Sequence, residues 1–269
     1  MGGFIIAFQD FKPIKGFFKS EWVGLDNFMT IFKNPFFGRA LLNTVVIAFW
    51  KIIFGQLVPL VFSILLNEVA HGGRKRVAQT IIYMPYFISW VLMSGIIIEI
   101  FSPSGGAVNR ILELMGLEPI FFLGSNAWFK PIIVATDVWK RFGWGTIIYM
   151  AALSGIDLNL YEAAMLDGAG RWKQTLNVTL PGIAPTAIML LTLSFGDILN
   201  AGFDQIYNLL NPMVHESGEI IDTLVYNLSL GNGMYGPATA LGLMNSLVSF
   251  TLISLGYILA DKFLDYRIF

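Results

Sequence analysis

Five long apolar segments restrict the folds that this chain can adopt. They cover roughly residues 40–67, 79–101, 131–154, 182–203 and 238–260. A helix needs about 20 consecutive, mainly apolar residues to cross the hydrocarbon core of a bilayer, and each segment reaches that length. Backbone amides inside a bilayer must be paired, and an α-helix pairs them within the segment itself. The pattern therefore predicts an all-α, polytopic membrane protein with about five spans.

The composition agrees with this prediction and excludes several other classes of protein. Hydrophobic residues make up 55% of the chain and charged residues 13%, whereas a typical soluble domain has about 25% charged residues. The chain has no Cys, so it has neither a disulfide framework nor a thiolate metal site. A net charge of −1 offers no footprint for nucleic acid. His71 and His215 lie far apart in sequence, and we expect no metal site.

A polar stretch from Asp157 to Pro181 separates the third and fourth apolar segments. Asp157 is suited to cap a short helix, because its carboxylate can accept from the free amides of the first turn. Ala163 and Ala164 favour a helix and have little side-chain bulk, so another protein could approach this helix closely. Gly168 permits a turn that a residue with a β-carbon would resist. The stretch thus predicts a short helix and a turn between two spans.

The spacing in this stretch also matches a known pattern. The letters E-A-A at 162–164 are followed by glycine at 168 and by V-T-L-P at 178–181. This resembles the EAA loop of ABC importer permeases, in which isoleucine usually stands at the position of Val178. The resemblance implies that residues 155–181, here called loop 155–181, dock a cytoplasmic ATPase through a coupling helix. The residues expected to take part in this docking are Glu162, Ala163, Ala164, Met165, Leu166, Asp167, Gly168, Leu180 and Pro181.

The resemblance covers nearly the whole chain from about Phe8 and narrows the family. Stretches such as Y-E-A-A-M-L-D-G-A-G-R-W at 161–172 are similar to the polysaccharide branch of maltose-type carbohydrate permeases. The resemblance implies the type I ABC importer fold and a transmembrane permease subunit for oligosaccharides or polysaccharide fragments. Its implied partners are a second permease in a heterodimer, two ATPase subunits, an extracellular solute-binding protein and the lipid bilayer of the bacterial plasma membrane.

The chain itself is expected to be no enzyme and to hold no cofactor. It has no phosphate-binding loop of the form G-x-x-x-x-G-K-[ST]. The resemblance places ATP and Mg²⁺ on the partner ATPase.

The expected topology depends on loop 155–181. Basic residues divide evenly between the two sides, so the positive-inside rule does not decide the orientation. A cytoplasmic loop 155–181 makes residues 1–39 an extracytoplasmic segment, 204–237 an extracytoplasmic loop and 261–269 a cytoplasmic tail, around a permease domain at 40–260. Because related permeases have a further span near the start, we expect the chain to begin inside or just after that span.

Charged residues inside the apolar segments are candidates for the substrate path. Each costs about 3 kcal/mol at the centre of a span, so it usually faces a cavity or a partner. Lys51 is expected to extend toward the outer interface. In the third segment, Lys140 and Arg141 lie between Trp139 and Trp144. Stacking on sugar rings and anchoring at the interface remain open for both tryptophans.

The fourth segment contributes a second set of candidates. Asp197, Asn200 and Asp204 are spaced i, i+3 and i+7, which predicts a polar stripe on one helical face, with Gln205 beside it. Such a stripe suits hydroxyl-rich solutes if it faces water. A network of hydrogen bonds between helices, without substrate contact, is the open alternative.

Other functions and the type of sugar remain to be weighed. A secondary transporter or channel would also explain spans with internal charges, but inverted repeats are not visible. No recurring cluster of acid, base and nucleophile supports a membrane enzyme. Lys140 and Arg141 could favour an anionic sugar, or they could be paired to Asp137 or Asp197.

Overall fold

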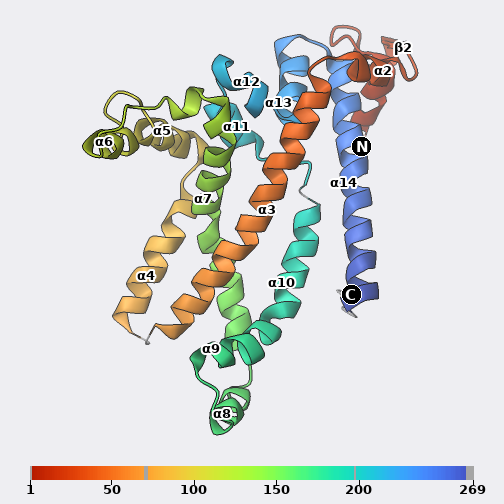
Figure 1. Cartoon of the computed structure of the whole chain (residues 1–269). Coiled ribbons are helices and arrows are strands. Elements are labelled where there is room, and N and C mark those ends of the chain that lie inside the picture. The colour runs from red at the N-terminus through yellow and green to blue at the C-terminus, as the bar shows by residue number, and fades with distance from the viewer. Residues whose placement is uncertain (1, 70–71, 197, 265–269) are drawn as a thin grey trace. The chain divides into compact units, whose positions relative to one another are not determined.

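The computed structural model describes residues 2–69, 72–196 and 198–264 of a mostly helical chain (Figure 1). The chain divides into two compact units. The first unit comprises Met1–Phe49, Ser89–Thr136 and Gly196–Leu252, and the second comprises Trp50–Ile88, Asp137–Phe195 and Ile253–Phe269. The long helices α3 (Phe37–Glu68), α7 (Asn126–Ser154) and α14 (Tyr235–Leu264) contribute residues to both units. The predicted all-α class is confirmed.

Three helices in the described part of the chain are long and apolar enough to cross a membrane. They are α3, the continuous helix Arg171–Phe195, and the Tyr235–Leu255 part of α14. These correspond to the first, fourth and fifth predicted spans. Helix α7 has 29 residues, about 43 Å, but it contains the charged residues Lys130, Asp137, Lys140 and Arg141. The helix is long enough to cross a membrane, but with these charged residues it is not among the three apolar helices named above.

The predicted second span, 79–101, is not one straight helix. Helix α4 (Gly73–Tyr83) continues as a 3₁₀ turn, Met84–Phe87, and then meets α5 (Trp90–Ile100) at an angle of 105°. Pro85 lies in the turn and has no amide to continue the helical ladder. The Ser89 hydroxyl accepts from the Leu92 amide at 3.3 Å and begins a new helix in another direction. Hydropathy alone could not reveal this break.

The predicted fourth span ends earlier than expected. The helix stops at Phe195, and the next one, α11 (Phe203–Leu209), begins after a non-helical link. Gly202 has φ +93°, in the left-handed region, and its amide donates to the Asn200 side chain at 3.3 Å. Because this conformation interrupts a right-handed helix, residues 198–204 cannot form a single helical face.

In the first unit, the N-terminal segment packs against residues 221–241. The segment contains a 3₁₀ helix Gly2–Phe8, the antiparallel strands β1 (Gln9–Asp10) and β2 (Glu21–Trp22), α1 (Gly16–Lys19) and α2 (Asp26–Lys33). The Asn27 amide group donates to the carbonyls of Ala7 and Gln9 at 2.9 and 3.0 Å. A core of small and aliphatic side chains joins this segment to α13 (Ile221–Tyr226) and the start of α14: Ala7, Ile31, Ala40, Ile221, Leu224, Leu228, Ala238, Ala240 and Leu241.

The expected loop 204–237 is largely folded into short helices. After α11 come a 3₁₀ turn Pro212–Val214, α12 (His215–Gly218), α13 and a π-helical segment Asn227–Gly231. The rest of the first unit consists of α5, α6 (Ala107–Leu114), a 3₁₀ turn Phe122–Gly124 and the beginning of α7.

Glycines allow helices of the second unit to approach closely. A Cβ on Gly143 of α7 would overlap the backbone carbonyl of Ile82 in α4. A Cβ on Gly145 would lie 2.8 Å from the ring of Pro59 in α3. The same unit contains α8 (Leu158–Leu166), α9 (Arg171–Gln174), a π-helical segment Thr175–Thr179 and α10 (Leu180–Phe195).

A polar chain also crosses the apolar interior of this unit. The Tyr149 hydroxyl of α7 donates to Gln56 of α3 at 2.7 Å, and the Gln56 amide donates to Ser194 of α10 at 3.1 Å. Each of these polar groups thus has a partner inside the unit, as burial in an apolar environment requires.

Candidate coupling loop and polar clusters

Loop 155–181 begins with a capped helix, as the sequence predicts. The Asp157 carboxylate accepts from the Asn159 amide at 2.9 Å, and α8 follows from Leu158. This bond satisfies one of the amides that the first turn of a helix leaves free.

The end of α8 explains the spacing between the alanines and the glycine. Gly168 has φ +74°, which a residue without a Cβ adopts at little cost. The Ala169 amide donates back to the Ala164 carbonyl at 2.9 Å, and the Gly168 amide donates to Met165 at 3.0 Å. These two bonds form a Schellman cap. In such a cap the left-handed residue, here Gly168, lies four positions after the first residue whose carbonyl accepts, here Ala164.

Two side-chain contacts hold this loop together, and a third joins it to α3. Tyr161 of α8 shares a 2.9 Å hydrogen bond with the buried hydroxyl of Thr179 in the π-helical segment. Arg171 at the start of α9 forms an ion pair with Glu68 at the end of α3, with 3.1 Å between Nη1 and Oε2. The Gln174 amide group donates to the Ala169 carbonyl at 2.8 Å. The middle of α8 is therefore bonded to the π-helical segment, and the residues after α8 are joined to α3.

Pro181 lies inside a helix and not at its start. The helix is continuous from Arg171 to Phe195, and Pro181 is the second residue of α10. An internal proline removes a hydrogen bond and crowds the carbonyl four residues earlier. The π-helical turn Thr175–Thr179 widens the backbone immediately before it, which is how the helix accommodates the proline without ending.

None of the residues of α8 is buried by the rest of the chain. Leu158 and Leu166 are 74% and 90% exposed, and Met165 is also exposed. Glu162 is exposed as well, and no residue in the described ranges forms a salt bridge with it. The helix therefore presents apolar and acidic groups that are available to another molecule.

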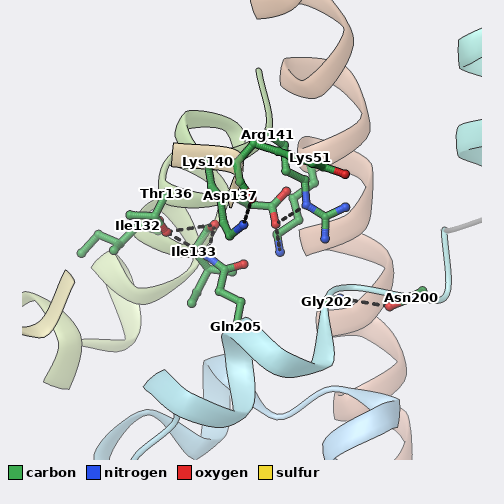
Figure 2. A network of polar contacts seen from close by, with 11 residues as sticks. Lys51, Ile132, Ile133, Thr136, Asp137, Lys140, Arg141, Asn200, Gly202 and Gln205 are labelled. Carbon is green, nitrogen blue, oxygen red and sulfur yellow. Dashed lines mark hydrogen bonds and ion pairs between the residues drawn. The ribbon is translucent and has the colours of Figure 1, made fainter. Parts of the chain in front are cut away.

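A charged cluster lies within the second unit (Figure 2). The Asp137 carboxylate lies 3.3 Å from the Lys51 ammonium and 3.2 Å from the Arg141 guanidinium. The side chains of Lys51 and Asp137 are only 10% and 8% exposed. The expectation that Lys51 extends to the outer interface is therefore wrong. Arg141, in contrast, is more than half exposed.

Lys140 points in a different direction from Arg141, because adjacent residues on an α-helix are about 100° apart around its axis. Its ammonium donates to the Tyr86 carbonyl at 2.8 Å and lies 5.4 Å from the centre of the Tyr86 ring. Trp144 stacks on the same ring, with 5.1 Å between centroids and 11° between planes. Trp139 is partly exposed. Lys140, Tyr86 and Trp144 thus form one packed group.

Gln205 serves the packing of the first unit. Its side chain is fully buried, and its amide group donates to the Ile133 carbonyl and the Thr136 hydroxyl, both at 2.8 Å (Figure 2). These bonds fix α11 against α7. For Gln205 the structure shows the hydrogen-bond network between helices, the second of the two predicted alternatives.

The predicted stripe of Asp197, Asn200 and Asp204 on one helix is wrong. Asn200 is exposed in the link before α11, and Asp204 is exposed on α11 itself. Asp197 lies outside the described residues, as does His71. The stripe fails because the helix ends at Phe195 and a left-handed glycine intervenes.

Two features of the structure are not predictable from the sequence pattern. No functional residue was expected in the N-terminal segment, yet Lys33 and Asn34 line a pocket together with Asn227 and Asn232. The π-helical turns also escaped notice, since no local sequence pattern predicts them. Within the described residues, no three His, Asp or Glu side chains gather as a metal site would require.

Comparison with known proteins identifies the family. Residues 60–265 match the model of the binding-protein-dependent transport system inner membrane component. The chain belongs to this family. It is a multi-pass permease subunit of an ABC importer and not itself an enzyme. This sets aside the alternative of a secondary transporter or channel.

Relatives of the permease include two proteins of Bacillus subtilis. Protein LplB is 43% identical over 263 residues, covering 98% of this chain and 83% of the relative. The polygalacturonan/rhamnogalacturonan transport system permease protein YteP is 41% identical, covering 98% of this chain and 82% of the relative.

A solved structure extends the similarity to the fold of the permease. It is of a bacterial ABC transporter involved in the import of the acidic polysaccharide alginate. Its matching chain has a TM-score of 0.90 at 36% sequence identity, covering 98% of this permease and 88% of that chain. The structure of an alginate transporter with an alginate pentasaccharide-bound periplasmic protein matches with a TM-score of 0.88 at 36% identity, covering 91% and 85%.

Proposed function

We propose that this permease carries oligosaccharides or polysaccharide fragments across the bacterial plasma membrane. The proposal is supported by the functions of similar proteins, which include transport of polygalacturonan or rhamnogalacturonan and of alginate. The working assembly contains a second permease, two ATPase subunits and an extracytoplasmic solute-binding protein. ATP and Mg²⁺ bind to the ATPase, and this chain needs no cofactor of its own.

Helix α8 is the feature that carries the proposed coupling to the ATPase. It is rigidly capped at both ends, yet the chain buries none of its residues. Exposed leucines beside the small Ala163 suit close docking into a groove of another protein, where Glu162 can pair with a basic group or cap a helix. An exposed apolar surface of this kind typically marks an interaction site.

The contacts of loop 155–181 provide a route for movement into the spans. The Tyr161–Thr179 bond joins α8 to the helix that continues as α10, and the Arg171–Glu68 pair joins the loop to the end of α3. Motion of a docked ATPase would therefore act on two spanning helices at once. Alternating access follows if these helices move as rigid bodies.

Docking of an ATPase also determines the orientation in the membrane. Loop 155–181 then faces the cytoplasm, and so does Glu68, which pairs with it. Because α3 is one continuous helix from Phe37 to Glu68, crossing the membrane with α3 leaves residue 36 on the extracytoplasmic side. The N-terminal segment and residues 204–237 would meet the solute-binding protein there.

The test is charge reversal on α8 in the complete transporter reconstituted in liposomes. In Glu162→Lys, we expect ATP-driven oligosaccharide uptake to fall strongly while membrane insertion and heterodimer assembly remain intact. Glu118→Lys makes the same change in an exposed loop of the first unit and serves as the matched control. Unchanged uptake in Glu162→Lys would count against docking through this helix.

A further inference from the structure

An open pocket of about 590 Å³ lies within the first unit. Its walls come from α2 and the following turn on one side, and from α13, the π-helical segment and the start of α14 on the other. The volume falls in the range of about 300–1,000 Å³ that small-molecule sites occupy. Because the pocket adjoins the residues that precede α3, the proposed topology places it on the extracytoplasmic side.

The π-helical segment gives the pocket two amide side chains on one face. The Asn232 backbone amide donates to the Asn227 carbonyl at 2.9 Å, a bond across five residues. Asn227 begins the π-helical segment and Asn232 follows its end, and both residues line the pocket. Neither side-chain amide has a hydrogen bond with another described residue. Each can offer two donors and one acceptor to a ligand.

The opposite wall supplies a positive charge and an aromatic ring. Lys33 ends α2 and is exposed, and no carboxylate in the described ranges forms an ion pair with it. The Phe36 ring is 54% exposed at the rim of the pocket. The side-chain oxygen (Oδ1) of Asn34 accepts from the Phe36 backbone amide at 2.9 Å, which leaves the side-chain NH₂ group of Asn34 available.

The pocket also contains a carboxylate, but it is almost fully buried. The Glu219 side chain is 8% exposed and lies 3.7 Å from the His215 imidazole, while its backbone carbonyl accepts from Asn43 at 2.9 Å. Its remaining oxygen can accept from a hydroxyl. The accessible charge of the pocket is therefore that of Lys33.

We propose that this pocket binds a sugar unit of an acidic oligosaccharide before it enters the membrane path. Lys33 pairs with the uronate carboxylate, Asn227 and Asn232 bind ring hydroxyls, and Phe36 packs against the face of the sugar ring. Hydroxyl groups, a carboxylate and one apolar face occur together on a uronic acid unit, and a neutral sugar would leave Lys33 without a partner. The proposal rests on the oligosaccharide transport proposed above and adds the charge of the sugar.

The test measures binding to the assembled transporter in nanodiscs, without solute-binding protein and without ATP. Trigalacturonate is the acidic probe and maltotriose the neutral one, both followed by isothermal titration calorimetry. The variant Lys33→Gln should weaken trigalacturonate binding at least about tenfold, since it removes a charge-assisted hydrogen bond. Asn227→Ala should weaken both sugars. Lys19→Gln is the matched control, because Lys19 is an exposed lysine of α1 outside the pocket.

Several outcomes would overturn the proposal. Wild-type transporter that does not bind trigalacturonate contradicts it, as does equal binding by wild type, Lys33→Gln and Asn227→Ala. A Lys33→Gln variant that binds trigalacturonate normally but loses affinity for the solute-binding protein would show that a protein occupies the pocket. ATP-driven uptake by wild type, measured separately, tests the proposed transport function, so failure of transport is distinguishable from failure of the pocket.

Discussion

Two exposed glycines of loop 155–181 offer a direct test of how α8 is held for docking. Gly168 has φ +74° and Gly170 has φ −70°, and a Cβ at either position would meet no atom within 4 Å. Side-chain clashes inside the chain are therefore absent at both positions. The two differ in backbone conformation, since only Gly168 lies in the left-handed region.

The expected effect follows from that conformation. A residue with a β-carbon pays about 1–2 kcal/mol in the left-handed region. An energy of that size changes an equilibrium about 5–30-fold, so Gly168→Val lowers the population of the capped helix by at most that factor. The apparent affinity for the ATPase falls with the competent population. Gly168→Asn should lose less, because asparagine visits this region more readily. Gly170→Val should be near neutral, since valine favours extended backbone.

The assay titrates ATPase subunits onto the permease heterodimer in nanodiscs and compares ATP-driven uptake in liposomes. We expect wild type and Gly170→Val to bind and transport alike, Gly168→Asn to be weaker, and Gly168→Val to be weakest. Equal losses at positions 168 and 170 would show that side-chain bulk at the interface matters more than the cap. No loss at either position would refute the role of the cap in coupling.

Two further predictions concern the packing of the second unit. Gly143→Ala should destabilise the detergent-solubilised complex by about 1–3 kcal/mol, because the new Cβ overlaps the Ile82 carbonyl. Gly55→Ala is the control, since its Cβ would have open space and should not change stability. Equal melting temperatures for the two variants would contradict this prediction. Asp137→Asn should lower the stability of the complex by about 3–5 kcal/mol, because it removes the carboxylate beside the buried Lys51. Adding Lys51→Met in the same chain should restore part of that stability. If the melting temperature of the double variant does not recover, the ion pair is not the cause of the loss.

The apolar segments predicted the helical class because burial in a bilayer depends on composition over about 20 residues. The same measure could not locate the 105° bend between α4 and α5 or the end of the fourth helix at Phe195. Both are local features of the backbone. Ser89 caps a new helix among apolar neighbours, and Gly202 adopts a left-handed conformation between Asn200 and α11.

Loop 155–181 was predictable in more detail, because its signals are local. The Asp157 cap acts within two residues, and the cap at Gly168 acts within five, so each can be inferred from the sequence nearby. The widened turn before Pro181 was not predictable. It depends on how a continuous helix accommodates a proline inside the packed unit.

The sequence by itself determined that the chain has membrane-spanning helices, as well as the capped helix of loop 155–181 and the resemblance to importer permeases. Only the tertiary structure decided which polar residues meet. It paired Lys51 with Asp137, buried Gln205 against the Ile133 carbonyl 72 residues away, and placed Lys33 across a pocket from Asn227. Polar interactions depend on distances of a few ångströms, and packing sets those distances for residues that lie far apart along the chain.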